Sequence, residues 1–117
     1  MISTRVRRRI LCRAATLGLV LCSLGPVPVD GAPKPATHTV TIDASRYQPD
    51  VLTVKAGDTV VWVNKDIVAH TATSQAGGFD SGIIVPGKSW KYKLKQSGEF
   101  AYTCTYHPTM KATLRVN

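Results

Sequence analysis

The chain lacks the pattern of α-helices, and this absence sets the predicted fold class. No stretch from residue 38 onward repeats apolar residues at helical spacing, and there is no internal repeat or low-complexity tract. Short β-branched and aromatic runs alternate with turn signals instead, which is typical of a sandwich or a barrel. We therefore predict one all-β domain over residues 38–117, after a flexible Pro- and Ala-rich lead-in over residues 32–37.

An apolar run of comfortable membrane-spanning length is also missing. Residues 14–24 are almost wholly apolar but too short. They follow five arginines and precede two prolines, which is the order of an export signal. We predict that residues 1–31 are such a signal and are removed, and that the domain is periplasmic or otherwise extracytoplasmic. Residues 7–11 also fit a twin-arginine signal, and a retained N-terminal anchor helix is the alternative.

Acidic residues are scarce, with 7 Asp and Glu against 15 Lys and Arg, and the formal net charge is +8. The predicted signal contains five arginines and Asp30, so the remaining chain keeps a formal charge of +4. This modest charge does not indicate nucleic-acid binding. We expect a monomer with no nucleic-acid partner and no stable membrane insertion once the signal is removed.

Strands are predicted where polar and apolar residues alternate, over residues 39–43, 47–54, 59–64, 89–95, 100–104 and 111–116. Pro49 interrupts the second run, which indicates a bend or an edge there. The run over 59–64 is apolar on both faces and is expected in the centre of a sheet. In the run over 89–95, Trp90 and Tyr92 share an inward face. The lysines between them form either a solvated face or a docking surface for an acidic partner.

Cysteine pairs are absent from the predicted mature domain, because only Cys104 lies outside the signal. Exported proteins normally use paired cysteines, so a lone one is a free thiol, an intermolecular bridge or a metal ligand. His107 and Met110 follow Cys104 at intervals of three residues. A thiolate, an imidazole and a thioether suit copper rather than calcium or magnesium. A second imidazole would come from His70, at an element boundary, or from His38, near the loose terminus.

Three other interpretations of this cluster stay open. Zinc could bind the cysteine and histidines, although methionine is a poor zinc ligand. A catalytic Cys–His pair would need a cleft, an orienting group and an oxyanion hole, and nothing in the sequence indicates these. Cys104 and Met110 could also be core residues of a purely structural domain.

A resemblance to a known family rests on residues spread over the whole predicted domain: Pro49, Leu52, Val54, Gly57, Asp58, Val60, Trp62, Asn64, His70, Phe79, Asp80, Ser81, Gly82, Pro86, Gly87, Gly98, Tyr102, Cys104, His107 and Met110. This pattern resembles the small cupredoxins, or type 1 blue copper proteins, of the plastocyanin and amicyanin branch. The two residues before and after His107 in the ligand loop resemble the short loop of amicyanins. The resemblance implies an antiparallel Greek-key β-sandwich with one type 1 copper ion, bound by His70, Cys104, His107 and Met110.

The resemblance also implies the function of a soluble extracytoplasmic electron carrier that cycles between Cu(II) and Cu(I). Such a protein is not an enzyme, and its partners are redox proteins that donate and accept electrons. The alternative is a periplasmic copper carrier or storage protein that hands on the ion. Electrons would pass through the edge of His107, and Pro108, Thr109 and the loop at Gly77–Gly78 would border the contact surface.

The sequence departs from the family pattern beside the predicted ligands. Thr71 stands where many members have asparagine, and its hydroxyl is expected to replace part of the tie between the two ligand-bearing loops. Tyr106 and Thr109 stand where many members have proline and phenylalanine. None of these three positions is a predicted ligand. The ligand types are retained, whereas the surface around His107 is altered.

Overall fold

The computed structural model describes residues 18, 23–26 and 34–117. The predicted export signal and the start of the predicted lead-in lie largely outside these residues, and both stay predictions. In the described part of the chain, no helix has the length and apolar character needed to cross a membrane.

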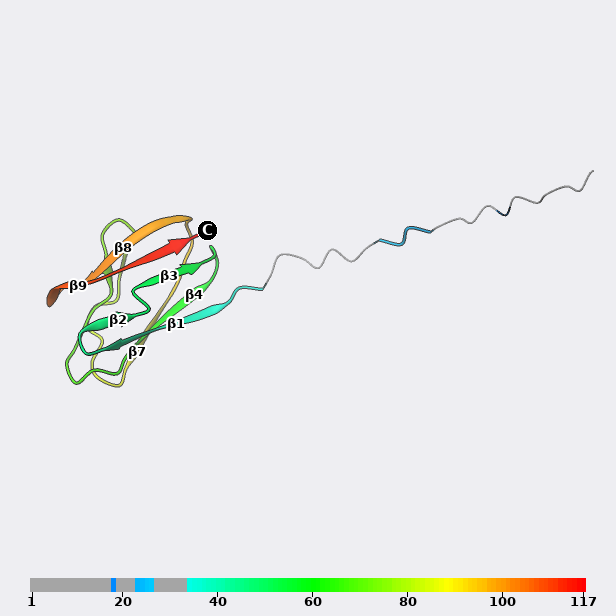
Figure 1. Ribbon diagram of the computed structural model, residues 1–117. Coiled ribbons are helices and arrows are strands. Elements are labelled where there is room, and N and C mark those ends of the chain that lie inside the picture. Colours follow the sequence, from blue (N-terminus) through cyan, green and yellow to red (C-terminus); the bar gives the residue numbers. More distant parts are fainter. Residues whose placement is uncertain (1–17, 19–22, 27–33) are drawn as a thin grey trace, which may run out of the picture. The chain divides into compact units, whose positions relative to one another are not determined.

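The described residues form nine strands in two sheets (Figure 1). One sheet has the order β2-β1-β4-β7 and the other the order β3-β9-β8-β5-β6. The strands are β1 (Thr37–Asp43), β2 (Arg46–Gln48), β3 (Val51–Val54), β4 (Thr59–Asn64), β5 (Thr73–Ser74), β6 (Phe79–Asp80), β7 (Ser89–Lys93), β8 (Gly98–Cys104) and β9 (His107–Val116). The predicted all-β sandwich is confirmed.

The expectation of wholly antiparallel sheets was wrong, because both sheets are mixed. β1 runs parallel to β4, and β3 runs parallel to β9. The chain leaves the first sheet after β2, adds β3 to the second sheet, and returns to the first sheet as β4. This crossing brings β4 back beside β1 in the same direction. The change of sheet occurs around Pro49, where the sequence predicted a break, since proline cannot donate a hydrogen bond to a strand ladder.

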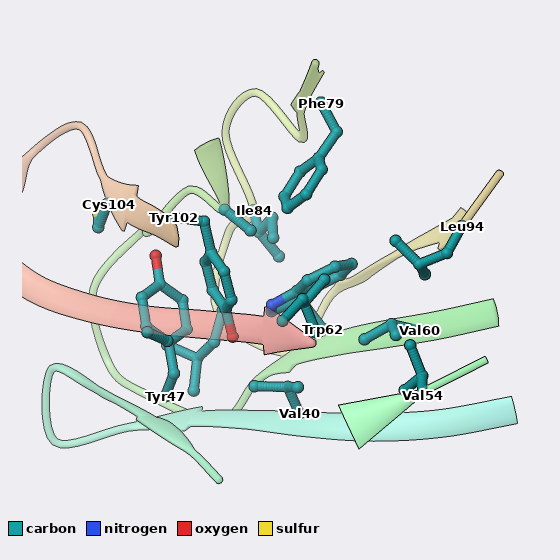
Figure 2. Close-up of a cluster of buried hydrophobic side chains, with 14 of the residues drawn as sticks. Val40, Tyr47, Val54, Val60, Trp62, Phe79, Ile84, Leu94, Tyr102 and Cys104 are labelled. Carbon is teal, nitrogen blue, oxygen red and sulfur yellow. The ribbon is translucent and has the colours of Figure 1, made fainter. Parts of the chain in front are cut away.

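Strict alternation in β1, β4 and β9 builds the core. Val40 and Ile42 of β1 and Val60 and Trp62 of β4 have no exposed surface. β4 has a neighbour on each side, as its two apolar faces predicted. Figure 2 shows Trp62 among the buried side chains of both sheets. Its ring centroid lies 5.4–5.6 Å from the rings of its three aromatic neighbours, Phe79, Trp90 and Tyr102.

β7 forms one edge of its sheet and confirms the predicted two-faced pattern. Trp90 and Tyr92 are half-buried against the core, whereas the lysines that alternate with them are exposed. The strand ends at Lys93 rather than at residue 95. Exposed lysines on an edge strand discourage pairing with a second chain.

The β8–β9 hairpin positions the metal centre. The two strands pair from Gly98 and Val116 to Cys104 and His107, with an irregularity in register just before Cys104. Only Thr105 and Tyr106 form the turn, so β9 begins at His107 rather than at residue 111 as predicted. The short predicted ligand loop is thus the tip of a tight hairpin, and Cys104 and His107 are cross-strand partners.

Candidate metal centre

Cys104 lies at the end of β8 with no exposed surface. It shares the buried face of this strand with Tyr102, as the alternation predicted. Its cross-strand partner His107 is half-buried, and the His107 Nδ1 atom lies 3.6 Å from Cys104 Sγ. A tight hairpin therefore supplies one sulfur and one imidazole nitrogen that face each other.

His70 reaches the same place from the loop that follows β4. Asn64, the last residue of β4, is fully buried and orders this loop. Its side-chain NH₂ group donates to the backbone carbonyls of Val68 and Ile84, and its side-chain oxygen accepts from the backbone N–H of Asp66. His70 then pairs with Ile84 through two backbone hydrogen bonds of 3.1 and 2.8 Å. The result is a fully buried imidazole whose Nδ1 lies 3.7 Å from Cys104 Sγ.

The spacing of these three donors fits one metal ion. The ligand atoms of His70, Cys104 and His107 all lie within 4.8 Å of one another. First-row divalent ions such as zinc bind thiolate sulfur at about 2.3 Å and imidazole nitrogen at about 2.0 Å. A sulfur and a nitrogen at these distances, with an angle of about 109–120° at the metal, are separated by about 3.5–3.7 Å. The observed sulfur–nitrogen separations of 3.6 and 3.7 Å match this requirement.

Met110 and His38, the other two residues considered as ligands, lie in different surroundings. Met110 is 4% exposed and begins the buried face of β9. This burial suits an inward-facing thioether, and its role as a ligand stays a prediction. His38 lies at the start of β1, opposite the start of β4, and its Nε2 contacts Asp58 Oδ2 at 2.9 Å. His38 is therefore at the other end of β4 from Asn64, away from the cluster.

Thr71 connects the two ligand-bearing segments. Its backbone N–H donates to Cys104 Sγ at 3.3 Å. Its side-chain hydroxyl accepts from the backbone N–H of Thr105 at 3.0 Å and lies 3.0 Å from the hydroxyl of Thr73. The hydroxyl thus makes the tie between the loops that was expected of it.

Asp66 was not predicted as part of the site. Its Oδ2 atom lies 2.8 Å from Nε2 of His70 and also accepts from the backbone N–H of Ser45 at 2.8 Å. These donors, with the backbone N–H of Ile67, lower the pKa of Asp66, and the hydrogen bond from Ser45 contributes most. The only sequence signal is an acidic residue four positions before the histidine, and this spacing has no meaning outside a helix unless the loop conformation is known.

Tyr47 closes the site on the side of the core. Its hydroxyl donates to the backbone carbonyl of Thr71, and its ring meets Tyr102 edge-on at 4.7 Å. Figure 2 shows this hydroxyl on the side of the ring that faces Cys104. Burial, reinforced by the nearby Cys104 charge and by Tyr102, raises the pKa of Tyr47 far above its ordinary value. Burial also raises the pKa of Tyr102 to about 12. Both phenols are therefore neutral at physiological pH.

Exposed apolar side chains occur in the loops that carry the cluster. The turn residue Tyr106 is 53% exposed, and Ile67 and Val68 are exposed in the His70 loop. Ile83 and Val85, on either side of the residue that pairs with His70, are exposed as well.

The expectation that Gly77–Gly78 would border the contact surface around His107 was wrong. A Cβ atom on Gly77 would meet Ser74, Phe79 and Phe100. Phe100 lies four residues before Cys104 on β8, about 13 Å along an extended strand. The turn is displaced because β5 leads the chain away from His70 along β8.

Comparison with known proteins agrees with this site. A family described as "Cupredoxin-like domain" matches residues 13–116. Amicyanin of Paracoccus versutus is 30% identical over 95 residues, covering 76% of this chain and 72% of that protein. Plastocyanin of Scenedesmus fuscus is 31% identical over 83 residues, covering 60% of this chain and 85% of that protein.

Solved structures give the same result. A purple cupredoxin from Nitrosopumilus maritimus is 26% identical with a TM-score of 0.64, covering 68% of this chain and 99% of that chain. A copper-containing nitrite reductase from Thermus scotoductus is 28% identical with a TM-score of 0.66, covering 74% of this chain but only 23% of that chain.

The chain belongs to the cupredoxin family. Within that family it is similar to amicyanin and plastocyanin, which confirms the predicted resemblance to small blue copper proteins. The cluster of His70, Cys104 and His107 fits the single type 1 copper ion of this class.

Proposed function

We propose that this chain is an electron carrier whose single copper ion is bound by His70, Cys104, His107 and Met110. The observation that carries the proposal is the convergence of two imidazole nitrogens on one buried thiol, at 3.6 and 3.7 Å. Bound copper would carry one electron by cycling between Cu(II) and Cu(I). Two imidazoles, a thiolate and a weak axial thioether form the donor set of a blue-copper electron-transfer site.

The surroundings of the donors support transfer of an electron rather than reaction with a substrate. His70 and Cys104 are fully buried, and each is held by hydrogen bonds from the backbone or from ordered side chains. A site held in this way moves little when its charge changes. Cys104 has no exposed surface, whereas a catalytic Cys–His pair needs a thiol that a substrate in an open cleft can reach. The nitrite reductase similarity concerns about a quarter of that chain, so the shared fold does not argue for catalysis here.

We propose that electrons enter and leave through the His107 side chain. It is half-exposed, whereas His70 and Cys104 have no exposed surface. Pro108 and Thr109 are exposed beside it, together with Tyr106 in the turn. The partners would be redox proteins that contact this end of the domain, and the protein would act as a monomer outside the cytoplasm.

The test of this function is repeated oxidation and reduction of the copper-loaded protein in the presence of a Cu(I) chelator. An electron carrier should regain its visible absorption after each cycle, because its buried donors retain the ion. Stepwise loss of absorption, with copper found on the chelator, would contradict electron transfer and favour the alternative function of a copper carrier or storage protein.

A further inference from the structure

Asp66 is the acidic side chain that touches a candidate copper ligand. Its Oδ2 atom lies 2.8 Å from Nε2 of His70, and the side chains of the pair are only 11% and 0% exposed. In the described part of the chain, no lysine or arginine lies within ion-pair distance of this carboxylate. Its negative charge is therefore directed at the imidazole.

The carboxylate determines which nitrogen of His70 carries the proton. A carboxylate only accepts hydrogen bonds, so the contact requires a proton on Nε2. The lone pair is then on Nδ1, the atom that lies 3.7 Å from Cys104 Sγ. A hydrogen bond from the imidazole to a carboxylate also makes the metal-binding nitrogen more basic.

Asp66 is itself held rigidly. Oδ2 accepts from the backbone of Ser45, in the turn between β1 and β2, and Oδ1 accepts from the backbone of Ile67. Both bonds measure 2.8 Å. The carboxylate thus links a turn of one sheet, its own loop and the candidate ligand, so its position relative to His70 is fixed before any metal binds.

We propose that Asp66 is a positioning residue that holds His70 in the Nδ1-donating tautomer, and that its negative charge favours Cu(II) over Cu(I) at this site. The inference rests on the proposed function, because it requires His70 to bind copper. Cu(II) carries one more positive charge than Cu(I) and gains more from a nearby anion. Asp66 therefore lowers the reduction potential.

The test replaces Asp66 by asparagine, which keeps a carbonyl acceptor of nearly the same shape and removes the charge. Because asparagine keeps the acceptor, the main change is the lost negative charge, and Cu(II) loses more affinity from it than Cu(I) does. We expect the ratio of Cu(II) to Cu(I) affinity to fall about 10-fold, which raises the potential by about 59 mV. Affinities are measured by competition with chelators of each ion, and the potential by a redox titration of the visible absorption.

The control variant is Glu99→Gln, which also removes one negative charge. Glu99 is exposed, lies near the start of β8, and faces Arg115 at 3.7 Å. Its loss should leave the potential nearly unchanged. An equal potential shift in both variants, or none in Asp66→Asn, would overturn the role of Asp66. A wild-type protein that forms no copper site would instead contradict the proposed function.

A second measurement does not depend on how any variant folds. In the ¹⁵N-labelled wild-type protein loaded with Cu(I), a long-range ¹H–¹⁵N spectrum reports which nitrogen of each histidine carries a proton. We expect the His70 proton on Nε2. A proton on Nδ1 would overturn the proposal directly.

Discussion

The Thr71 hydroxyl gives a sharp prediction, because a single oxygen joins two segments that are 34 residues apart in sequence. Thr71 is 3% exposed, and its Oγ1 accepts from the Thr105 backbone at 3.0 Å. It also lies 3.0 Å from the Thr73 hydroxyl and 3.3 Å from that of Thr105. Replacement by valine keeps the shape and deletes these contacts. Removing one partner of a buried hydrogen bond costs about 1–3 kcal/mol.

We therefore expect Thr71→Val to lower the free energy of unfolding of the metal-free domain by about 1–3 kcal/mol. Thr71→Ser, which retains the hydroxyl, should cost less than Thr71→Val. Urea unfolding followed by tryptophan fluorescence measures both, with an unchanged m value as the sign that the unfolded state is not altered. Equal stabilities of the valine variant and wild type would refute the reasoning that the hydroxyl ties the loops.

Two further predictions concern parts of the domain outside the donor cluster. Ala44 has a φ of 49°, a left-handed conformation that costs a non-glycine residue about 1–2 kcal/mol, so Ala44→Gly should stabilise the domain by about 0.5–1 kcal/mol. Ala101→Gly, in the middle of β8, should destabilise it in the same urea assay. Hydrogen bonds, chiefly the one from the Ala36 backbone, lower the pKa of Asp58 to about 2. The stability that this carboxylate contributes is present above about pH 4 and lost as the pH falls towards 2, so Asp58→Asn should flatten the acid limb of a stability–pH curve. An acid limb of unchanged steepness would contradict that assignment.

The strands and the donor residues could be predicted because both depend on local pattern. Alternation located β4 at residues 59–64 and placed Trp62 inward, and the break at Pro49 followed from the chemistry of proline. The spacing of Cys104 and His107 gave two donors, and a hairpin makes such neighbours in sequence neighbours in space.

Features that depend on how loops fold could not be predicted in this way. The parallel pairing of β1 and β4 arises when the chain crosses between sheets, which periodicity does not reveal. The contact of Asp66 with His70 exists because Asn64 orders the intervening loop through three hydrogen bonds. The Gly77–Gly78 turn was misplaced for the same reason, since its position follows from the direction of β5.

The central claim is that Cys104 and the two histidines bind copper together, and the visible spectrum of the Cu(II)-loaded protein tests it most directly. A thiolate–Cu(II) bond gives an intense visible band in blue copper proteins. We predict that the wild-type protein shows this band with one equivalent of copper and that Cys104→Ser does not, although the variant still folds. A colourless wild-type protein, or a band of equal intensity in Cys104→Ser, would contradict the account.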